Sequence, residues 1–477
     1  MKNAARFPVT SPTAFRFIAR AALILVAFVI GESTAHAIPV FARKYQTSCQ
    51  TCHIVFPKLN AFGEAFRLRG YRMPGETEDM IKQPPVSLGA PAYKKLWPQA
   101  VWPGEIPSYV PLAVNVEMAD VNASSLNEDG TVTSVKNDLQ LPTEVALLGA
   151  GTLGEHVSFW TETVFGEKAD GSVEVEIEQA RLGFDSPFGP EDLFHFRIGK
   201  FQPNLVDGLH GGIFVSTDAG IDSFFGYNPI GVNGGTGPGE MTPSPISLPG
   251  SVRGIEGYGI IKHRALWVAG LVNGIGPSAG GNFDGNNAKD VYARFDYKIG
   301  GMGLDGDTGG QPIVPDKNWR DNSLRLGVFA YRGDGSNIDF PTTLEDEAEA
   351  TIQDVHFLRT GVYANLFFQD LNVVGAYLHG TDSLRVVDTE SAALLHAIEP
   401  DWHAWFTQAD YVIYPWLQAG FRYEMLTPAD VSAPSLKTGV FNVSALVRAN
   451  VKVMVEYQRD LRQGENHSLN AVMRFAF

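Results

Sequence analysis

From Pro107 to its end, the chain consists of segments of about ten residues in which apolar and polar side chains alternate. In residues 288–299, for example, Val291 and Phe295 fall on one face and Arg294 falls on the other. Period-two alternation predicts strands with one apolar and one polar face, and segments of this length are typical of transmembrane β-barrels. A soluble sandwich of two sheets gives the same period, so alternation alone leaves that fold open.

The spacing of the segments favours the barrel. Sixteen strands are expected, at residues 107–119, 138–150, 154–166, 173–186, 192–201, 250–262, 264–273, 288–299, 320–332, 353–368, 370–380, 401–414, 416–427, 438–449, 450–460 and 467–477. Long connections, expected at 120–137, 202–249, 274–287, 333–352, 381–400 and 428–437, alternate with short ones. Outer-membrane barrels have long extracellular loops and short periplasmic turns. Residues 300–319 break the rule, and a phase slip after Ile177 predicts a β-bulge.

The two ends of the chain add to the membrane assignment. Residues 1–37 combine scattered basic residues, an apolar stretch at 21–31 and a small-x-small site at 35–37, which predicts a secretory signal peptide rather than a membrane anchor. Phe477 ends an alternating last segment and resembles the insertion signal of outer-membrane barrels, although a soluble sheet can also end this way. We expect a protein of the bacterial outer membrane, in contact with its lipid.

Composition narrows the function. Charged residues make up 19% of the chain, below the usual share of about 25% in soluble domains. The 53 acidic residues outnumber the 37 basic ones, which argues against nucleic acid as a partner because phosphate binding needs a basic footprint. No triad of nucleophile, base and acid and no phosphate-binding loop is evident, so no catalytic residue is assigned.

Both cysteines of the chain lie in the motif Cys49-Gln50-Thr51-Cys52-His53. This spacing predicts covalent c-type heme attachment, because the two thiols add to the heme vinyl groups and the next residue supplies an imidazole ligand. A redox-active CxxC pair is the alternative, but no second pair and no βαβ pattern surround the motif. We therefore expect one heme c, bound by Cys49 and Cys52, with His53 as a ligand of its iron.

The second axial ligand of the iron is expected to be Met73. No other histidine lies between His53 and the barrel, so the remaining candidates are Met73, Met80 and a lysine. Residues 57–68 carry an apolar stripe at helical spacing, which would cover one heme face and bring Met73 back towards the iron. A thioether ligand raises the heme potential. Packing alone would also explain a methionine at this place.

Residues 42–73 carry a resemblance to a known family. The residues that match are Ala42, Cys49, Cys52, His53, Pro57, Leu59, Asn60, Phe62, Gly63, Phe66, Gly70 and Tyr71. They resemble the N-terminal cytochrome of the fused outer-membrane cytochrome–porins, whose members in iron-oxidising bacteria oxidise ferrous iron at the cell surface. Related fusions occur in bacteria not known to oxidise iron. The resemblance therefore implies the architecture more strongly than the electron donor.

These observations predict four parts: a signal peptide at 1–37, a small helical monoheme c-type cytochrome domain at 38–80, a Pro-rich linker at 81–106 and a porin-like barrel at 107–477. The fold class is therefore all-β, a transmembrane antiparallel barrel of about 16 strands with a small helical domain in front. The cytochrome is expected on the periplasmic side or within the barrel lumen.

Three further places were weighed as sites. Glu345, Asp346, Glu347 and Glu349 cluster in an expected extracellular loop. Their oxygens suit weak capture of divalent cations, although such runs are more often solvated loops. Asp284 and Asp290 are weaker candidates of the same kind. Residues 206–226 are long and apolar for a surface loop, which predicts a segment that folds inward to the cytochrome or lines the pore. His210 is the best barrel histidine for contact with the heme region, although a pore-lining role is the more common one for such a residue.

Three functions follow from this organisation. The main hypothesis is an electron carrier that oxidises an extracellular donor, ferrous iron, through one heme and passes electrons to a periplasmic cytochrome or copper protein. The first alternative is a heme-bearing porin for solute passage, since a barrel of about 16 strands encloses an aqueous lumen. The second is a conduit that moves electrons outward to external acceptors. A high heme potential suits iron oxidation, and a low potential suits outward transfer.

Overall fold

The structure is a computed structural model of the 477-residue chain. It describes residues 40–75, 86–87, 95, 105–126, 131–167, 171–206, 251–273, 288–310, 317–334, 339–343, 349–388, 391, 393–399, 401–427, 435–462 and 466–477. The expected signal peptide and most of the expected linker lie outside these ranges. Within the linker, strands β3 (Val86–Ser87) and β4 (Glu105–Ile106) pair with each other. No helix among the described residues is long and apolar enough to cross a membrane.

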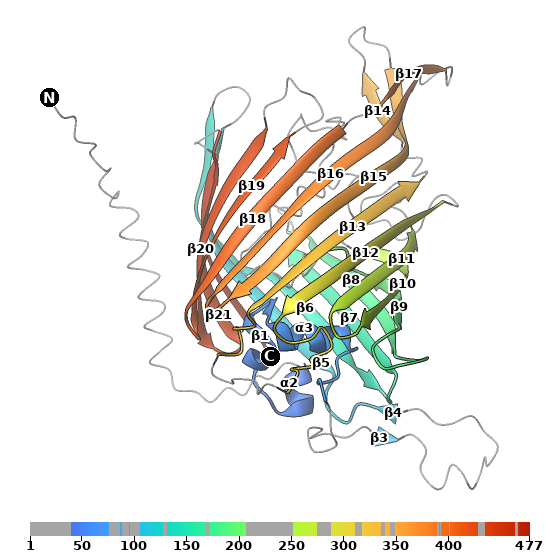
Figure 1. The fold of residues 1–477 in the computed structure, drawn as a ribbon. Coiled ribbons are helices and arrows are strands. Elements are labelled where there is room, and N and C mark those ends of the chain that lie inside the picture. The colour runs from blue at the N-terminus through green and yellow to red at the C-terminus, as the bar shows by residue number, and fades with distance from the viewer. Residues whose placement is uncertain are drawn as a thin grey trace, which may run out of the picture.

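Sixteen long antiparallel strands of the described residues close into one barrel (Figure 1). In chain order they are β5 (Leu112–Leu126), β6 (Val132–Leu153), β7 (Val157–Glu167), β8 (Val173–Asp185), β9 (His195–Phe201), β10 (Val252–Ile261), β11 (Ala265–Asn273), β12 (Lys289–Gly300), β13 (Ser323–Asp334), β15 (Glu349–Phe368), β16 (Leu371–Asp388), β18 (Asp401–Tyr414), β19 (Leu417–Thr427), β20 (Leu436–Arg448), β21 (Val451–Asp460) and β22 (His467–Ala476). Strand β22 pairs with β5 and so closes the ring. Two short strands, β14 (Asp339–Thr343) and β17 (Leu394–Ile398), pair with β15 and β16.

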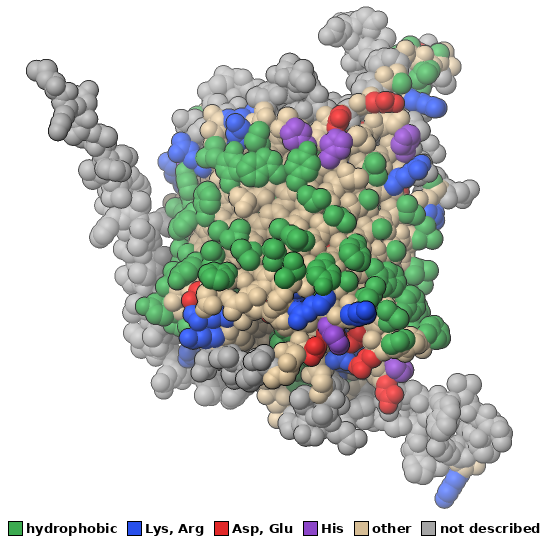
Figure 2. All heavy atoms as spheres, in the orientation of Figure 1, with side chains coloured by type: hydrophobic (Ala, Val, Ile, Leu, Met, Phe, Trp, Pro, Cys, Tyr) green, Lys and Arg blue, Asp and Glu red, His purple; other side chains and the backbone are tan. Residues whose placement is uncertain are grey.

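The two faces of the barrel wall are opposite in character to those of a soluble protein. On β12, the side chains of Phe295 and Tyr297 are about half exposed on the outside, at 48% and 51%, whereas Arg294 and Asp296 are buried on the inside. Apolar side chains spread over the outer surface, and charged ones gather at its two ends (Figure 2). A wall that is apolar outside and polar inside fits a bilayer. The chain is therefore a porin-like β-barrel of the outer-membrane type, and the sandwich alternative is excluded.

Exposed aromatic side chains gather beside the short turns of the barrel. Phe368, Tyr414 and Trp416 flank the turns that join β15 to β16 and β18 to β19, and each is about half exposed. Aromatic girdles of this kind mark the interface between hydrocarbon and head groups. At the same end, the backbone N–H and C=O of Phe477 both bond to Val114, at 2.9 and 2.7 Å. The terminal residue thus completes the closing pair of strands.

Each of the sixteen strands lies where the alternation predicts it, with bounds that differ by a few residues at most ends. The predicted bulge is also present: the register of β7 and β8 shifts beside Glu178. The loops predicted at 120–137, 333–352 and 381–400 are partly wrong, because β5, β6, β15 and β16 reach into them and β14 and β17 lie within them. Backbone pairing continues there beyond the apolar band, where alternation no longer signals a strand.

The irregular connection between β12 and β13 has a structural reason. Residues 301–310 and 317–322 of this connection lie at the short-turn end, where a turn of two or three residues is usual. Leu304 is buried in the same apolar cluster as Leu68 of the N-terminal part of the chain. A side chain at Gly306 would place its Cβ 2.2 Å from Cβ of Pro74. The connection is long because it covers this part of the chain.

Residues 40–75, which we call the N-terminal segment, lie at the short-turn end of the barrel, close to the C-terminus (Figure 1). The segment contains α2 (Val40–Tyr45), the 3-10 turn η1 (Cys49–Thr51), β1 (His53–Val55), β2 (Lys58–Leu59) and α3 (Ala61–Leu68). It bonds to several parts of the wall: Arg43 donates to the carbonyl of Leu112, and Lys58 donates to Asp410 at 2.6 Å. The helix indicated at 57–68 is shorter than expected: α3 begins at Ala61, because Lys58 and Leu59 pair with β1 as strand β2.

Candidate functional site

The CxxCH motif forms a tight turn whose backbone is held by Asn60. Ser48 caps η1 by accepting from the N–H of Gln50, and the motif continues directly into β1. Asn60 caps α3 by accepting from the N–H of Gly63 at 2.8 Å, and its amide donates to the carbonyl of Thr51 at 3.0 Å. Asn60 therefore fixes the start of α3 against the turn that carries the two thiols.

Helix α3 lies directly on the backbone of Cys52. A Cβ added at Gly63 would lie 2.1 Å from the carbonyl oxygen of Cys52, so any side chain at this position would force the two apart. Phe66, one turn further along the same side, is 5% exposed in the apolar cluster against which Cys52 packs, and Leu68 is 1% exposed in a separate cluster with barrel residues. Helix α3 thus joins the motif to an apolar core, and Gly63 permits the close approach.

The imidazole of His53 is oriented as a metal ligand would be. Its Nδ1 donates to the carbonyl oxygen of Pro57 at 3.0 Å, because a carbonyl can only accept. This bond places the proton on Nδ1 and leaves the lone pair on Nε2. Burial lowers the pKa of His53, although backbone carbonyls of Pro57 and Lys58 oppose that effect. The ring is therefore held in the neutral form that binds metals.

Cys49 and Cys52 are both half-buried and are not joined in a disulfide. Burial raises the pKa of both thiols, and for Cys52 burial together with the nearby Cys49 raises the pKa to about 12. A CxxC pair used for thiol exchange needs a lowered thiol pKa. The environment of this pair therefore does not favour the redox alternative.

Met73 lies in an aromatic cluster next to Cys52. Met73 is 8% exposed and is buried together with Tyr45, Phe66 and Tyr71, and Cys52 packs against this cluster. Trp160, from barrel strand β7, packs on the same cluster. The side chain that was predicted as the second ligand is thus brought near the motif, into a dry environment that the segment and the barrel build together.

One cavity of about 570 Å³ connects these residues. It is lined by Cys49, Cys52, His53 and Met73, and it continues along barrel side chains such as Arg181. Pockets for cofactors are typically 300–1,000 Å³. Two thiols and an imidazole with its lone pair on Nε2 are what attachment of a c-type heme requires, and a thioether is one of the usual second ligands. The residues present therefore fit a heme.

The two lysines of the N-terminal segment are engaged elsewhere. The ammonium group of Lys44 donates to the hydroxyls of Tyr45 and Thr152, at 2.8 and 3.1 Å. Lys58 forms a buried ion pair with Asp410, and the two side chains are 2% and 1% exposed. These contacts argue against either lysine as the second ligand. Met80, the other candidate, lies outside the described residues.

No protein-family model and no curated protein sequence matches the chain. Among solved structures, the outer-membrane channel DcaP of Acinetobacter baumannii shares 12% identity at a TM-score of 0.45 and covers 77% of this chain and 96% of its own. A loop-deletion mutant of the outer-membrane protein OmpT of Vibrio cholerae shares 13% at 0.42, covering 77% and 98%. The anion-selective porin of Comamonas acidovorans shares 8% at 0.42, covering 77% and 99%.

Some of the predicted loop sites can be placed. Asp290 is not a loop ligand: it is 2% exposed inside the barrel and accepts from the hydroxyl of Tyr331 at 2.6 Å. Asp284, Glu345, Asp346 and Glu347 lie outside the described residues, and Glu349 is the first residue of β15. Asp290 lies within the strand predicted at 288–299, and its side chain points inward, where Tyr331 engages it instead of a cation.

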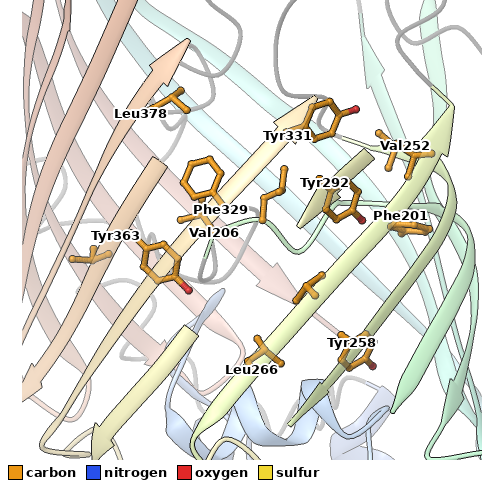
Figure 3. Close-up of a cluster of buried hydrophobic side chains, with 14 of the residues drawn as sticks. Phe201, Val206, Val252, Tyr258, Leu266, Tyr292, Phe329, Tyr331, Tyr363 and Leu378 are labelled. Carbon is orange, nitrogen blue, oxygen red and sulfur yellow. The ribbon is translucent and has the colours of Figure 1, made fainter. Parts of the chain in front are cut away.

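The apolar stretch at 206–226 is described only at its first residue. After β9 ends at Phe201, the chain turns into the barrel, where Leu205 and Val206 are 4% and 3% exposed. Val206 lies inside the wall among Phe329 and other apolar side chains (Figure 3). The start of the stretch therefore folds inward as expected. Residues 207–226, with His210, lie outside the described part of the chain.

Sequence reasoning missed the barrel residues that hold the segment. Buried charges run from the wall to α3: Arg294 donates to Asp296 at 2.9 Å, Arg325 donates to Asp296 at 2.8 Å, and Arg325 also reaches Glu64 at 3.3 Å. Each barrel residue in this series of ion pairs falls on the polar face of a predicted strand. That face was assigned to the lumen, but nothing local indicated which charges would meet the N-terminal segment.

Proposed function

We propose that this protein is an outer-membrane electron carrier that holds one covalent heme within its barrel. In this proposal it takes electrons from an extracellular donor, ferrous iron, and passes them to a periplasmic cytochrome or copper protein. The observation that carries the proposal is the shared cavity of Cys49, Cys52, His53 and Met73. No other set of described residues combines two thiols with an oriented imidazole.

The protein's own residues would have separate tasks. Cys49 and Cys52 would attach the cofactor, and the bond from His53 to Pro57 would hold the imidazole in the tautomer that binds iron through Nε2. Met73 would supply a thioether, which raises the potential of the site. A heme bound here supplies one-electron exchange between the ferrous and ferric states. The aromatic cluster around Met73 excludes water, which also affects the potential.

The barrel would contribute by placing this site inside a membrane wall. The contacts of Arg43, Lys58 and Glu64 with the wall tie the N-terminal segment to several strands. A carrier held in this way would lie at the short-turn end of the barrel, against the inner face of its wall. An electron donor that stays outside the cell would therefore reach it through the barrel rather than by entering the periplasm.

Reduction of the purified, oxidised protein by ferrous iron tests this proposal. We expect the absorption bands of reduced heme to appear on addition of ferrous iron and to stay absent on addition of magnesium ions. If dithionite reduces the heme but ferrous iron does not, the donor is wrong. If neither produces heme bands, the electron-transfer function fails altogether.

Solute passage is the second candidate, and the barrel itself supports it. A ring of sixteen strands encloses an aqueous lumen, and this one has charged side chains such as Arg294 and Asp296 on its inner face. Conductance across a planar bilayer distinguishes this function, because a passage for solutes would give stepwise currents with or without heme. The heme potential distinguishes outward electron transfer from iron oxidation, because outward transfer requires a low potential.

A further inference from the structure

Residues 69–74, which we call the Met73 loop, are held chiefly by the barrel wall. The loop follows the end of α3 at Leu68 and precedes the residues outside the described range. Its backbone turns sharply, because Gly70 and Tyr71 both have positive φ, +66° and +65°. Such a turn is strained for Tyr71 and needs support from its surroundings. The barrel supplies that support from three directions.

Two arginines of the loop bind two aspartates of the barrel. Arg72 donates to Asp185, the last residue of β8, at 2.8 Å, and it also donates to the carbonyl of Gly154 at 2.9 Å. Arg69 donates to Asp192, in the connection between β8 and β9, at 3.1 Å. Asp185 is 4% exposed and Asp192 is 8% exposed. These are charged contacts removed from water, whose loss is costly.

A buried histidine of the barrel joins the two aspartates. His195, the first residue of β9, is 1% exposed, and its two ring nitrogens face the carboxylates of Asp185 and Asp192, each at 3.6 Å. Its ring stacks on Tyr258 of β10 at 5.0 Å between centroids. His195 therefore lies between the two carboxylates, behind the two arginines on either side of the turn.

The turn itself fits against this group of residues. A Cβ at Gly70 would lie 2.1 Å from the carboxylate of Asp185, so the backbone of the turn is pressed on the aspartate. Tyr71 stacks on Trp160 of β7 at 5.5 Å, and its hydroxyl accepts a bond from Arg181 of β8. On the far side, Gly306 of the long connection abuts Pro74. Met73 lies between these supports.

We propose that Asp185, Asp192 and His195 are positioning residues that hold Met73 at the heme site. We call these three residues the barrel anchor. The inference rests on the proposed heme. It adds that the barrel, rather than the N-terminal segment, decides whether the thioether of Met73 is positioned to bind the heme iron. Coordination of the cofactor and integrity of the barrel wall are then coupled, although the anchor touches neither thiol nor His53.

Proteolysis tests the anchor without any heme signal. The full-length protein is treated with trypsin, which cleaves after arginine, and the peptides are identified by mass. Asp185→Asn/Asp192→Asn should speed cleavage after Arg69 and Arg72 by about tenfold or more, since a protease needs the loop to open locally. Asp370→Asn is the matched control: it breaks a barrel ion pair with Arg320 that does not involve the loop, and it should leave cleavage unchanged. Unchanged cleavage in the double variant would overturn the inference.

Spectroscopy then tests the link to Met73. In the same double variant we expect full heme staining, loss of the sulfur-to-iron charge-transfer band and a lowered potential. His195→Leu should weaken the band similarly, and His195→Gln should restore part of it. A band and potential that persist in the double variant would refute the positioning role. If the unaltered protein carries no heme, the proposed function fails instead, and the trypsin experiment still decides whether the anchor holds the loop.

Substitution of the loop arginines instead of the barrel aspartates controls for a folding defect of the barrel. Heat-modifiable migration on gels reports a folded barrel. Should the aspartate variants lack it, Arg69→Gln/Arg72→Gln removes the same contacts without altering any strand. This pair of substitutions should reproduce both the faster opening of the loop, read by a protease that does not depend on arginine, and the loss of the band. A folded barrel with normal values for both would overturn the inference.

Discussion

At the scale of single residues, Met73 is the proposed second ligand of the heme iron. It lies in the same cavity as the CxxCH motif and in the same cluster as Cys52. Met73→Ala should abolish the sulfur-to-iron charge-transfer band and lower the heme potential, because a thioether ligand raises that potential. Visible absorption and a redox titration measure the two effects.

Met80→Ala is the control for this prediction, and it should leave the band and the potential nearly unchanged. If Met73→Ala keeps both, another group must bind the iron. The remaining groups are Met80, a lysine or a barrel histidine such as His210. A lysine ligand would require Lys44 or Lys58, or a lysine outside the segment, to leave its present surroundings.

A candidate site can be proposed from the sequence where its residues are local, and not where its partners are distant. Cys49 to His53 form a motif within five residues, so a heme site can be proposed there from the sequence alone. Lys58 and Asp410 are 352 positions apart, and no periodicity links them. The barrel anchor is of the second kind: its residues are ordinary polar positions until closure of the barrel brings them to the Met73 loop.

At the scale of elements, Glu64 links helix α3 to the barrel wall through Arg325. Burial raises the pKa of Glu64, but the nearby guanidinium groups of Arg67 and Arg325 outweigh this effect and hold the pKa well below its ordinary value. A carboxylate with a lowered pKa stabilises the folded state at pH above the ordinary value. That contribution disappears as the pH falls through the pKa of the folded state.

Glu64→Gln should therefore weaken the protection of α3 amides at pH 7 by about 2 kcal/mol, the usual range for hydrogen bonds to charged groups. Hydrogen exchange of α3, corrected for intrinsic rates, measures the difference from the unaltered protein. This difference should shrink as the pH falls well below the ordinary pKa of glutamate. Glu399→Gln, at an exposed position in the connection between β17 and β18, is the control. A difference that is equal at pH 7 and at low pH would contradict the assignment.

Strand positions were predicted well because each strand carries its own signal. From Asp290 to Ile299 in β12, buried residues alternate with exposed apolar ones, and this pattern needs no partner to be recognised. Extensions such as β14 and β17 were missed because they lie beyond the apolar band. The long connection after β12 was recognised as irregular. The reason for its length is that Gly306 packs over Pro74, and this contact appears only in three dimensions.

At the scale of the whole molecule, the even number of strands fixes which ends lie together. The N-terminal segment and the C-terminus share the short-turn end, and β14 and the start of β15 lie at the opposite end (Figure 1). Short turns are periplasmic in outer-membrane barrels. An epitope tag inserted at Glu345 should therefore bind antibody on intact cells, and a tag at Pro91 should bind only after the outer membrane is permeabilised. The opposite labelling pattern would show that the barrel is inserted the other way.

The central claim is that this barrel carries a covalent heme on its CxxCH motif. Heme staining after denaturing electrophoresis of the purified protein tests it most directly, because only a covalently held cofactor stays with the unfolded chain. We predict that the unaltered protein stains at its own mobility, that Cys49→Ala and Cys52→Ala each stain weakly or not at all, and that the double variant does not stain. Full staining of the double variant, or none in the unaltered protein, would contradict the claim.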